Sequence, residues 1–150
     1  NDQTMILAYI FYNGVYALSS YPFGWIGDKW GMKLIFCTGL LCFAITYAGM
    51  ALTSGTTAVF MLFFIYGLFA GATDGVSKAW ASQFIPKAEH ATGLGFLSGC
   101  TSIAAVIAST WTGFVWEFVN ASAALMMSGA GAIAALVYLL GMPGARKTES

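Results

Sequence analysis

The sequence predicts an all-α, multi-pass membrane protein with five transmembrane helices. Hydrophobic residues make up 59% of its 150 residues and charged residues only 8%, whereas roughly a quarter of the residues in soluble domains are charged. The mean hydropathy is +0.77. The apolar residues gather in five segments, each near the length of about 20 residues that a helix needs to cross a bilayer. A soluble helical core would need polar outer faces, which these segments lack.

The five helices are expected within a single membrane domain that covers residues 1–150. Pro22 and Gly24 should end the first helix, Pro86 the third and Pro143 the fifth, since proline cannot continue a regular helix. A short polar turn at residues 53–57 should separate the second from the third. Because all connections are short, consecutive helices should be antiparallel neighbours. The predicted ranges are 4–26, 33–53, 58–84, 92–116 and 121–142.

Basic residues predict how these helices are oriented. Lys29 and Lys33 lie in the first connection, Lys87 in the third, and Arg146 and Lys147 in the tail, whereas the second and fourth connections contain neither Lys nor Arg. Basic connections usually stay on the cytoplasmic side. The N-terminus of this segment should therefore lie outside the cell and its C-terminus inside. The expected location is the cell membrane, plasma or inner.

A polar stripe runs along the first predicted helix, and it consists of Tyr9, Tyr12, Asn13, Tyr16 and Ser20. The spacings of three and four residues place these side chains on one helix face. Such groups are costly inside a membrane unless they face protein or water. Three tyrosines are also too large for close helix packing, and their hydroxyls need partners. The stripe therefore favours the lining of a substrate cavity.

The fourth predicted helix carries a second, smaller polar line, formed by Ser98, Ser102, Ser109 and Thr112, with Thr101 beside it. Two interpretations stay open. The hydroxyls could line the same cavity, or they could mark a helix–helix contact, where small Ser and Thr side chains are frequent. The second and fifth helices contain no charge and should face lipid. The small-residue ridges Gly67/Gly71/Gly75 and Gly95/Gly99 indicate close packing only.

Asp74 and Lys78 place a buried ion pair within the third predicted helix. They are four residues apart, a spacing that brings the side chains of an Asp–Lys pair together. Three roles stay open: a structural ion pair, direct contact with a polar or charged substrate, and proton carriage by Asp74. The pairing opposes the last role, because a nearby ammonium stabilises the ionised carboxylate.

The ten residues from Gly24 to Lys33 read GWIGDKWGMK, and this stretch resembles the loop signature of the major facilitator superfamily of secondary transporters, G-x-L-[AS]-D-[RK]-x-G-[RK]-[RK]. The agreeing positions are Gly24, Asp28, Lys29, Gly31 and Lys33, and the departures are Ile26, Gly27 and Met32. Residues 71–79 and 113–117 look like the tenth and the end of the eleventh helix of many bacterial members.

The resemblance implies transport of a small solute by alternating access. It makes the chain helices eight to twelve of about twelve, although helices two to six would give the same pattern. The partners would be a small-molecule substrate, with or without a coupling proton, the lipid bilayer and the missing N-terminal half of the same transporter. In the family the loop aspartate approaches the N-terminus of a neighbouring helix. Here Asp28 would act as a conformational latch on residues 91–93, while Lys29 and Lys33 would anchor the loop at the headgroups or serve only as topology signals.

Two other classes of protein compete with a transporter. A non-transporting membrane scaffold subunit would have no need of the tyrosine stripe. A membrane-embedded enzyme is disfavoured because the single histidine, His90, lies in a loop beside Glu89 and no nucleophile motif or metal-ligand pattern occurs. The sequence therefore predicts neither catalysis nor a metal or cofactor. The zero net charge also implies no attraction to nucleic acid. Tyr12, Asn13 and Tyr16 would suit a sugar, an aromatic compound or an organic acid.

Overall fold

The structure is a computed structural model that describes residues 2–53 and 55–142, and within these residues every regular element is a helix. The prediction of an all-α chain is confirmed. The helices are α1 (Asp2–Trp30), α2 (Met32–Leu52), α3 (Thr56–Ser82), the short 3₁₀ helix η1 (Lys87–Glu89), α4 (His90–Phe118) and α5 (Ala121–Gly141). Pro143, Arg146 and Lys147, which entered the sequence predictions, lie outside the described residues.

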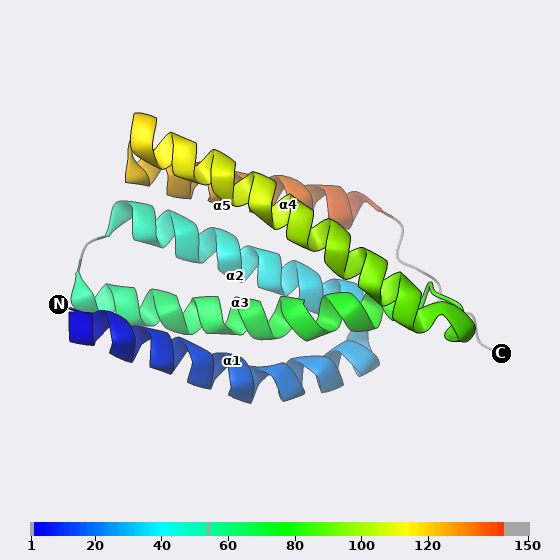
Figure 1. The fold of residues 1–150 in the computed structure, drawn as a ribbon. Coiled ribbons are helices and arrows are strands. Elements are labelled where there is room, and N and C mark those ends of the chain that lie inside the picture. The colour runs from blue at the N-terminus through cyan, green and yellow to red at the C-terminus, as the bar shows by residue number, and fades with distance from the viewer. Residues whose placement is uncertain (1, 54, 143–150) are drawn as a thin grey trace.

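Helix α1 is longer than predicted, because it continues through Pro22 and Gly24 to Trp30. The expectation that these two residues end the helix is wrong. Proline removes one backbone hydrogen bond and bends a helix without necessarily ending it, and membrane helices tolerate this because neighbouring groups satisfy the freed carbonyl. Figure 1 shows the resulting bow of α1 along α3.

The connection between α1 and α2 is a single residue, Gly31. Its φ of 106° lies in a region that glycine adopts freely and other residues avoid. The Gly31 amide donates to the Gly27 carbonyl at 2.9 Å, which closes the end of α1. The first predicted connection, residues 27–32, is therefore mostly helical, and the chain reverses direction at Gly31.

The helices form two groups, α1–α3–α2 on one side and α5–α4 on the other, joined where α2 packs along α5 (Figure 1). The closest pairs are α1 with α3, α2 with α3, and α2 with α5. Consecutive helices run antiparallel as predicted, but α1 packs mainly on α3 and touches α2 only slightly. Among the described residues α1 makes no contact with α4. Helix α4 is accordingly the most exposed helix of the bundle, and Val115 is its buried residue.

Helix α2 lies at the centre of the described bundle, so only one of its faces is left free to meet lipid as predicted. Its buried face packs between α3 and α5, and the large side chains that it exposes are apolar. The buried residues are Met32, Ile35, Cys37, Gly39, Ala44 and Thr46, and the large exposed ones are Leu34, Leu41, Ile45 and Leu52.

The two predicted glycine ridges pack closely only in part. Gly67 and Gly71 are buried where α3 packs on Val15 and Ser19 of α1. A Cβ atom added at Gly67 would lie 2.8 Å from the Val15 side chain, so close packing is confirmed at these two positions. By contrast, Gly75 and the Gly95/Gly99 ridge of α4 face open space within the described chain.

Four of the five helices are long and apolar enough to cross a membrane: Met32–Leu52, Thr57–Ser82, Lys87–Phe118 and Ala121–Gly141. The chain is therefore a multi-pass membrane protein. Helix α1 has 29 residues, which is ample length, but the polar stripe on it lowers its hydropathy below that of the others. Its crossing of the membrane stays a prediction.

Candidate functional site

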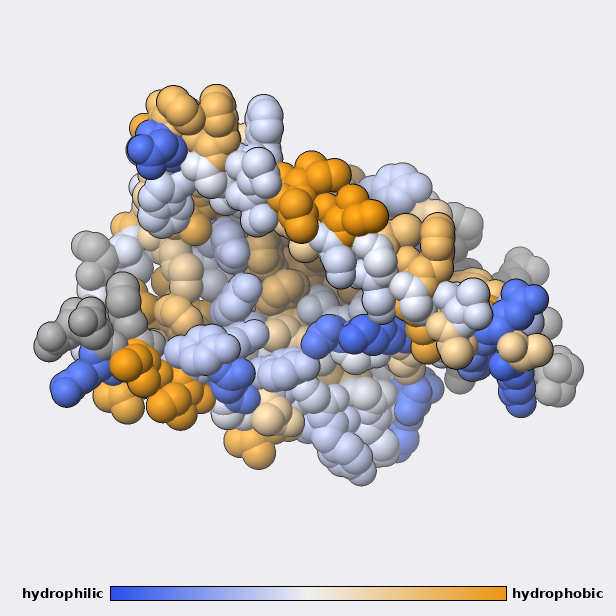
Figure 2. Space-filling view, viewed as in Figure 1, coloured by the Kyte–Doolittle hydropathy of each residue, from blue (hydrophilic) through white to orange (hydrophobic). Residues whose placement is uncertain are grey.

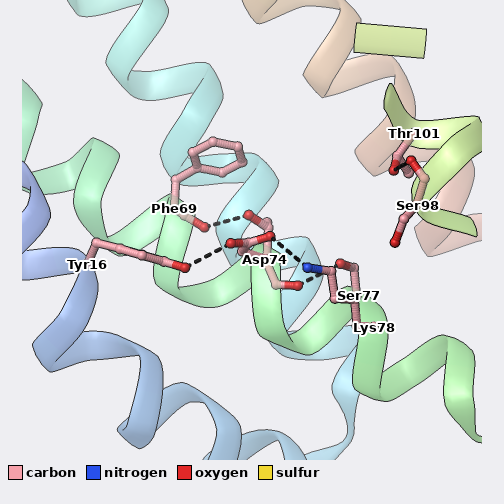
Figure 3. A network of polar contacts seen from close by, with 8 residues as sticks. Tyr16, Phe69, Asp74, Ser77, Lys78, Ser98 and Thr101 are labelled. Carbon is pink, nitrogen blue, oxygen red and sulfur yellow. Dashed lines mark hydrogen bonds and ion pairs between the residues drawn. The ribbon is translucent and has the colours of Figure 1, made fainter. Parts of the chain in front are cut away.

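The phenol of Tyr16 joins the predicted cavity stripe to the predicted ion pair. Its Oη donates a hydrogen bond of 2.8 Å to Oδ2 of Asp74, across the contact between α1 and α3 (Figure 3). Lys78 Nζ lies 3.9 Å from the other carboxylate oxygen, Oδ1. A hydrogen bond to an ionised acceptor is the stronger kind, whereas an ion pair of this length is weak where water reaches it. Tyr16 is therefore the tighter partner of Asp74.

This ion pair is not buried within the described chain, contrary to the prediction. The side chains of Lys78 and Asp74 are 59% and 57% exposed, because none of the described helices covers this face of α3. The neighbouring hydroxyls do not compete for the carboxylate, since Ser77 donates to the Asp74 backbone carbonyl and Thr73 to that of Phe69. Asp74 thus keeps both oxygens for Tyr16 and Lys78.

The predicted tyrosine stripe forms a continuous column of rings on α1. The Tyr9 and Tyr12 centroids are 6.0 Å apart, and the Tyr12 and Tyr16 rings are nearly parallel, with 12° between their planes and 6.4 Å between centroids. Tyr9 is 62% exposed. Asn13 is less available to a ligand than predicted, because its amide already donates to the Tyr9 carbonyl of its own helix at 2.8 Å. The rings therefore present most of the contact surface here.

A cavity of about 810 Å³ lies between the α1–α3–α2 group and the α5–α4 group of helices. Tyr66 of α3 lines it and also packs on Tyr12, with 5.2 Å between ring centroids. Tyr66 therefore connects the tyrosine column to this cavity. In Figure 2 the surface is hollowed between α4 and α3, with blue hydrophilic residues over the middle of α3 and orange hydrophobic ones over α4. The other lining residues include Phe43, Tyr47, Ser109, Trp111, Thr112 and Ser128.

The polar line predicted on α4 is divided by the structure. Ser109 and Thr112 line the cavity, whereas Ser98 and Ser102 do not and are exposed. Figure 3 shows Ser98 and Thr101 apart from the Tyr16–Asp74 group, and the Thr101 hydroxyl donates to the Ser98 carbonyl of its own helix. Within residues 2–53 and 55–142, Ser98 and Ser102 therefore support neither of their two predicted roles, cavity lining and helix–helix contact.

Several aromatic residues that line the cavity were not predicted from the sequence as site residues, chiefly Phe43, Tyr47 and Tyr66. A signal was present, because Tyr47 and Tyr66 place phenols in apolar segments, and the rule applied to the first helix holds for them too. What the sequence lacks is the register between helices. Tyr66 contacts Tyr12 only because Gly67, the next residue, lets α3 approach α1 closely.

The residues of the loop signature lie together at the other end of α1. Gly27, Asp28, Gly31 and Lys33 line a cavity of about 390 Å³ together with Trp80 of α3 and Leu140 of α5. Lys33 Nζ donates to the Met142 carbonyl just beyond α5, where a cation also meets the negative end of the helix dipole.

Two further loop residues have no contact with the start of α4. Lys29 Nζ lies 3.8 Å from the centre of the Trp25 ring, a cation–π contact within one helix turn. Asp28 is exposed and, within the described chain, does not contact residues 91–93. The latch contact is thus not formed in this arrangement, and the latch role stays a prediction.

Long apolar helices, a phenol-lined cavity between them and a Tyr–Asp–Lys group on an exposed helix face are typical of membrane transport proteins. The whole chain, residues 1–150, matches the profile of the Major Facilitator Superfamily. The chain belongs to this family.

Two curated relatives share recognisable similarity with the chain. An uncharacterized MFS-type transporter of Methanocaldococcus jannaschii is 31% identical over 112 residues, which cover 75% of this chain and 28% of that protein. A putative niacin/nicotinamide transporter of Bacillus subtilis is 25% identical over 134 residues, which cover 89% of this chain and 34% of that protein. The chain therefore spans between 28% and 34% of the length of these relatives.

Proposed function

We propose that this chain is part of a secondary active transporter that moves a small solute across the cell membrane by alternating access. The observation that carries the proposal is the Tyr16–Asp74–Lys78 group. Asp74 lies five residues beyond the middle of α3, or about 7 Å along the helix axis, well within a hydrocarbon layer whose half-thickness is about 15 Å. A charged side chain at that depth costs roughly 3 kcal/mol or more in free energy of insertion. A water-filled transport pathway would hydrate the carboxylate and so explains why it lies there.

The competing functions account for fewer of these features. A scaffold subunit needs helix contacts, but it does not need three phenols and a carboxylate gathered on the contact between α1 and α3. An enzyme would need a reactive group, whereas both oxygens of Asp74 already have partners in Tyr16 and Lys78. Membership of the transporter family also favours transport over both alternatives.

The proposal includes the missing N-terminal half of the same transporter and assigns this chain to helices eight to twelve. Two observations support a further covering segment. The relatives are about three times as long as the matched region, and α4 leaves Gly95 and Gly99 open to space on a helix that is long and apolar. Such an exposed apolar face is typical of an interaction surface.

The proposed orientation puts the Gly31 turn, with Lys29 and Lys33, on the cytoplasmic side and the start of this segment outside. In this arrangement Asp28 serves as a latch that forms in one of the two access states. Its present exposure leaves the carboxylate free to change partners when the cavity opens to the other side.

Transport is tested with the full-length protein in proteoliposomes that are incubated in a mixture of small metabolites. We expect at least one solute to accumulate inside relative to protein-free vesicles, and we expect Asp74→Asn to reduce that uptake by about tenfold or more. Glu117→Gln is the matched control, because it also neutralises an exposed carboxylate, near the end of α4 and outside the Tyr16–Asp74 group. If no solute enters above the protein-free level, the proposal of transport is wrong.

A further inference from the structure

In the Tyr16–Asp74–Lys78 group the carboxylate and the ammonium differ in how many further partners they can take. This difference favours one sign of charge in a ligand. The Asp74 carboxylate has Tyr16 on Oδ2 at 2.8 Å and Lys78 on Oδ1 at 3.9 Å. An arriving cation would share this carboxylate with both partners, and it would meet repulsion from the Lys78 ammonium. A cationic ligand is therefore opposed at this carboxylate.

Lys78 has more spare capacity than Asp74. An ammonium carries three donors, and within the described chain Lys78 makes one long contact while its side chain is 59% exposed. An anion can reach the free side of the ammonium without breaking the hydrogen bond between Tyr16 and Asp74. A carboxylate at this position would gain a charge-assisted hydrogen bond of the stronger kind.

Aromatic rings of α1 lie next to Asp74, on the other side of the carboxylate from Lys78 (Figure 3). Tyr16 is bonded to the carboxylate that Lys78 also approaches, and the nearly parallel Tyr12 ring follows one turn further along α1. A planar ring is stabilised by stacking on such a ring in addition to its area burial. The hydroxyl of Tyr16 is already used as a donor, so this residue offers a ligand the face of its ring.

We propose that the solute is a planar aromatic carboxylate, whose carboxylate pairs with Lys78 and whose ring lies against Tyr12 and Tyr16. This inference rests on the proposed transport function, because it names the substrate class of that same site. In it Tyr16 contacts the ring of the solute and also holds Asp74, the carboxylate beside the ammonium of Lys78.

The test is equilibrium binding to the full-length protein in lipid nanodiscs, followed by calorimetry. Benzoate, benzamide and benzamidinium have nearly the same planar shape but are negative, neutral and positive, and cyclohexanecarboxylate keeps the carboxylate without the aromatic ring. We expect benzoate to bind at least about tenfold more tightly than benzamide and cyclohexanecarboxylate, and benzamidinium most weakly. Equal or tighter binding of benzamide or benzamidinium, or no binding of benzoate, overturns the inference.

A set of lysine variants locates the binding. Lys78→Gln should remove the preference for benzoate over benzamide, Lys78→Arg should keep it because a guanidinium also pairs with carboxylates, and Lys87→Gln is the control on an exposed lysine outside the group. An unchanged preference in Lys78→Gln overturns the inference even if that variant transports nothing. Uptake of another solute without benzoate binding would refute only the substrate class, whereas Lys78-dependent binding without uptake of any solute would refute only transport.

Discussion

Tyr16 Oη lies 2.8 Å from Asp74 Oδ2, although 58 positions separate the two residues in the sequence. The contact is possible because α3 approaches α1 closely at Gly67 and Gly71, whose added side chains would collide with Val15 and Ser19. The Gly71 contact lies one turn before Asp74 on α3, and the Ser19 contact one turn after Tyr16 on α1. The packing of small residues thus sets the geometry of the polar group.

The first prediction concerns the coupling between Tyr16 and Asp74. Tyr16→Phe removes the donor and should lower the thermal stability of the full-length protein by about 1 kcal/mol. Asp74→Asn weakens the same bond, so the double variant should be less destabilised than the sum of the two single variants. Thermal unfolding of the four proteins measures this difference. Strictly additive effects would mean that the hydrogen bond contributes nothing.

The second prediction separates a structural ion pair from a ligand-binding one. Asp74→Asn alone should reduce uptake by about tenfold or more. The double variant Asp74→Asn/Lys78→Gln should not restore uptake, because the ammonium itself contacts the solute. A purely structural pair behaves differently, since removing both charges leaves no unpaired charge in the membrane. Normal uptake by the double variant together with failure of the single one would therefore assign the pair to architecture.

The fold class could be predicted from the sequence because long apolar segments have few alternatives in a membrane. The helix ends at Pro22 and Gly24 were predicted wrongly, because a local rule that holds in water was overridden by helix packing and by the lack of other hydrogen-bond partners in lipid. The reversal at Gly31 could not be distinguished from the neighbouring glycines, since only the backbone torsion of Gly31 is special.

The candidate site was predicted in its parts but not in its assembly. Periodicity placed Tyr9, Tyr12 and Tyr16 on one face of a helix, and spacing paired Asp74 with Lys78. Periodicity within one helix carries no information on which helix it meets, so the contact of Tyr16 with Asp74 was not foreseen. The same limit explains why Ser98 and Ser102 were grouped with Ser109, although only the last of these lines the cavity.

The third prediction tests the close contact that positions the site. Gly71→Ala should lower stability by about 1–3 kcal/mol, because the new Cβ would collide with the side chain and backbone of Ser19. Gly75→Ala, one turn further along α3, is the matched control, since nothing in the described chain lies within 4 Å of an added Cβ there. Thermal denaturation followed by size-exclusion chromatography measures both. Equal stability of the two variants would contradict the packing argument.

The fourth prediction distinguishes two glycines that the loop signature treats alike. Gly31→Ala should lower the stability by about 1–2 kcal/mol, because a φ of 106° forces the new side chain into a left-handed backbone conformation. Gly24→Ala should be neutral or slightly stabilising, since Gly24 is helical and has open space around it. Yields of monodisperse protein and thermal midpoints compare them. A larger loss at Gly24 than at Gly31 would show that the signature glycines serve another purpose.

The fifth prediction concerns Asp28 as a latch. Asp28→Asn should shift the resting population toward the inward-facing state, because a neutral amide is attracted less strongly than a carboxylate to the free amides at the start of α4. Cys100 is exposed on α4, so its labelling by a membrane-impermeant maleimide, in a background with Cys37→Ser and Cys42→Ser, reports access from each side. We expect slower labelling from outside and faster labelling from inside. Lys87→Gln controls for a charge change on the same predicted side of the membrane, in the connection between α3 and α4. Identical labelling of Asp28→Asn and the unmodified protein would exclude the latch.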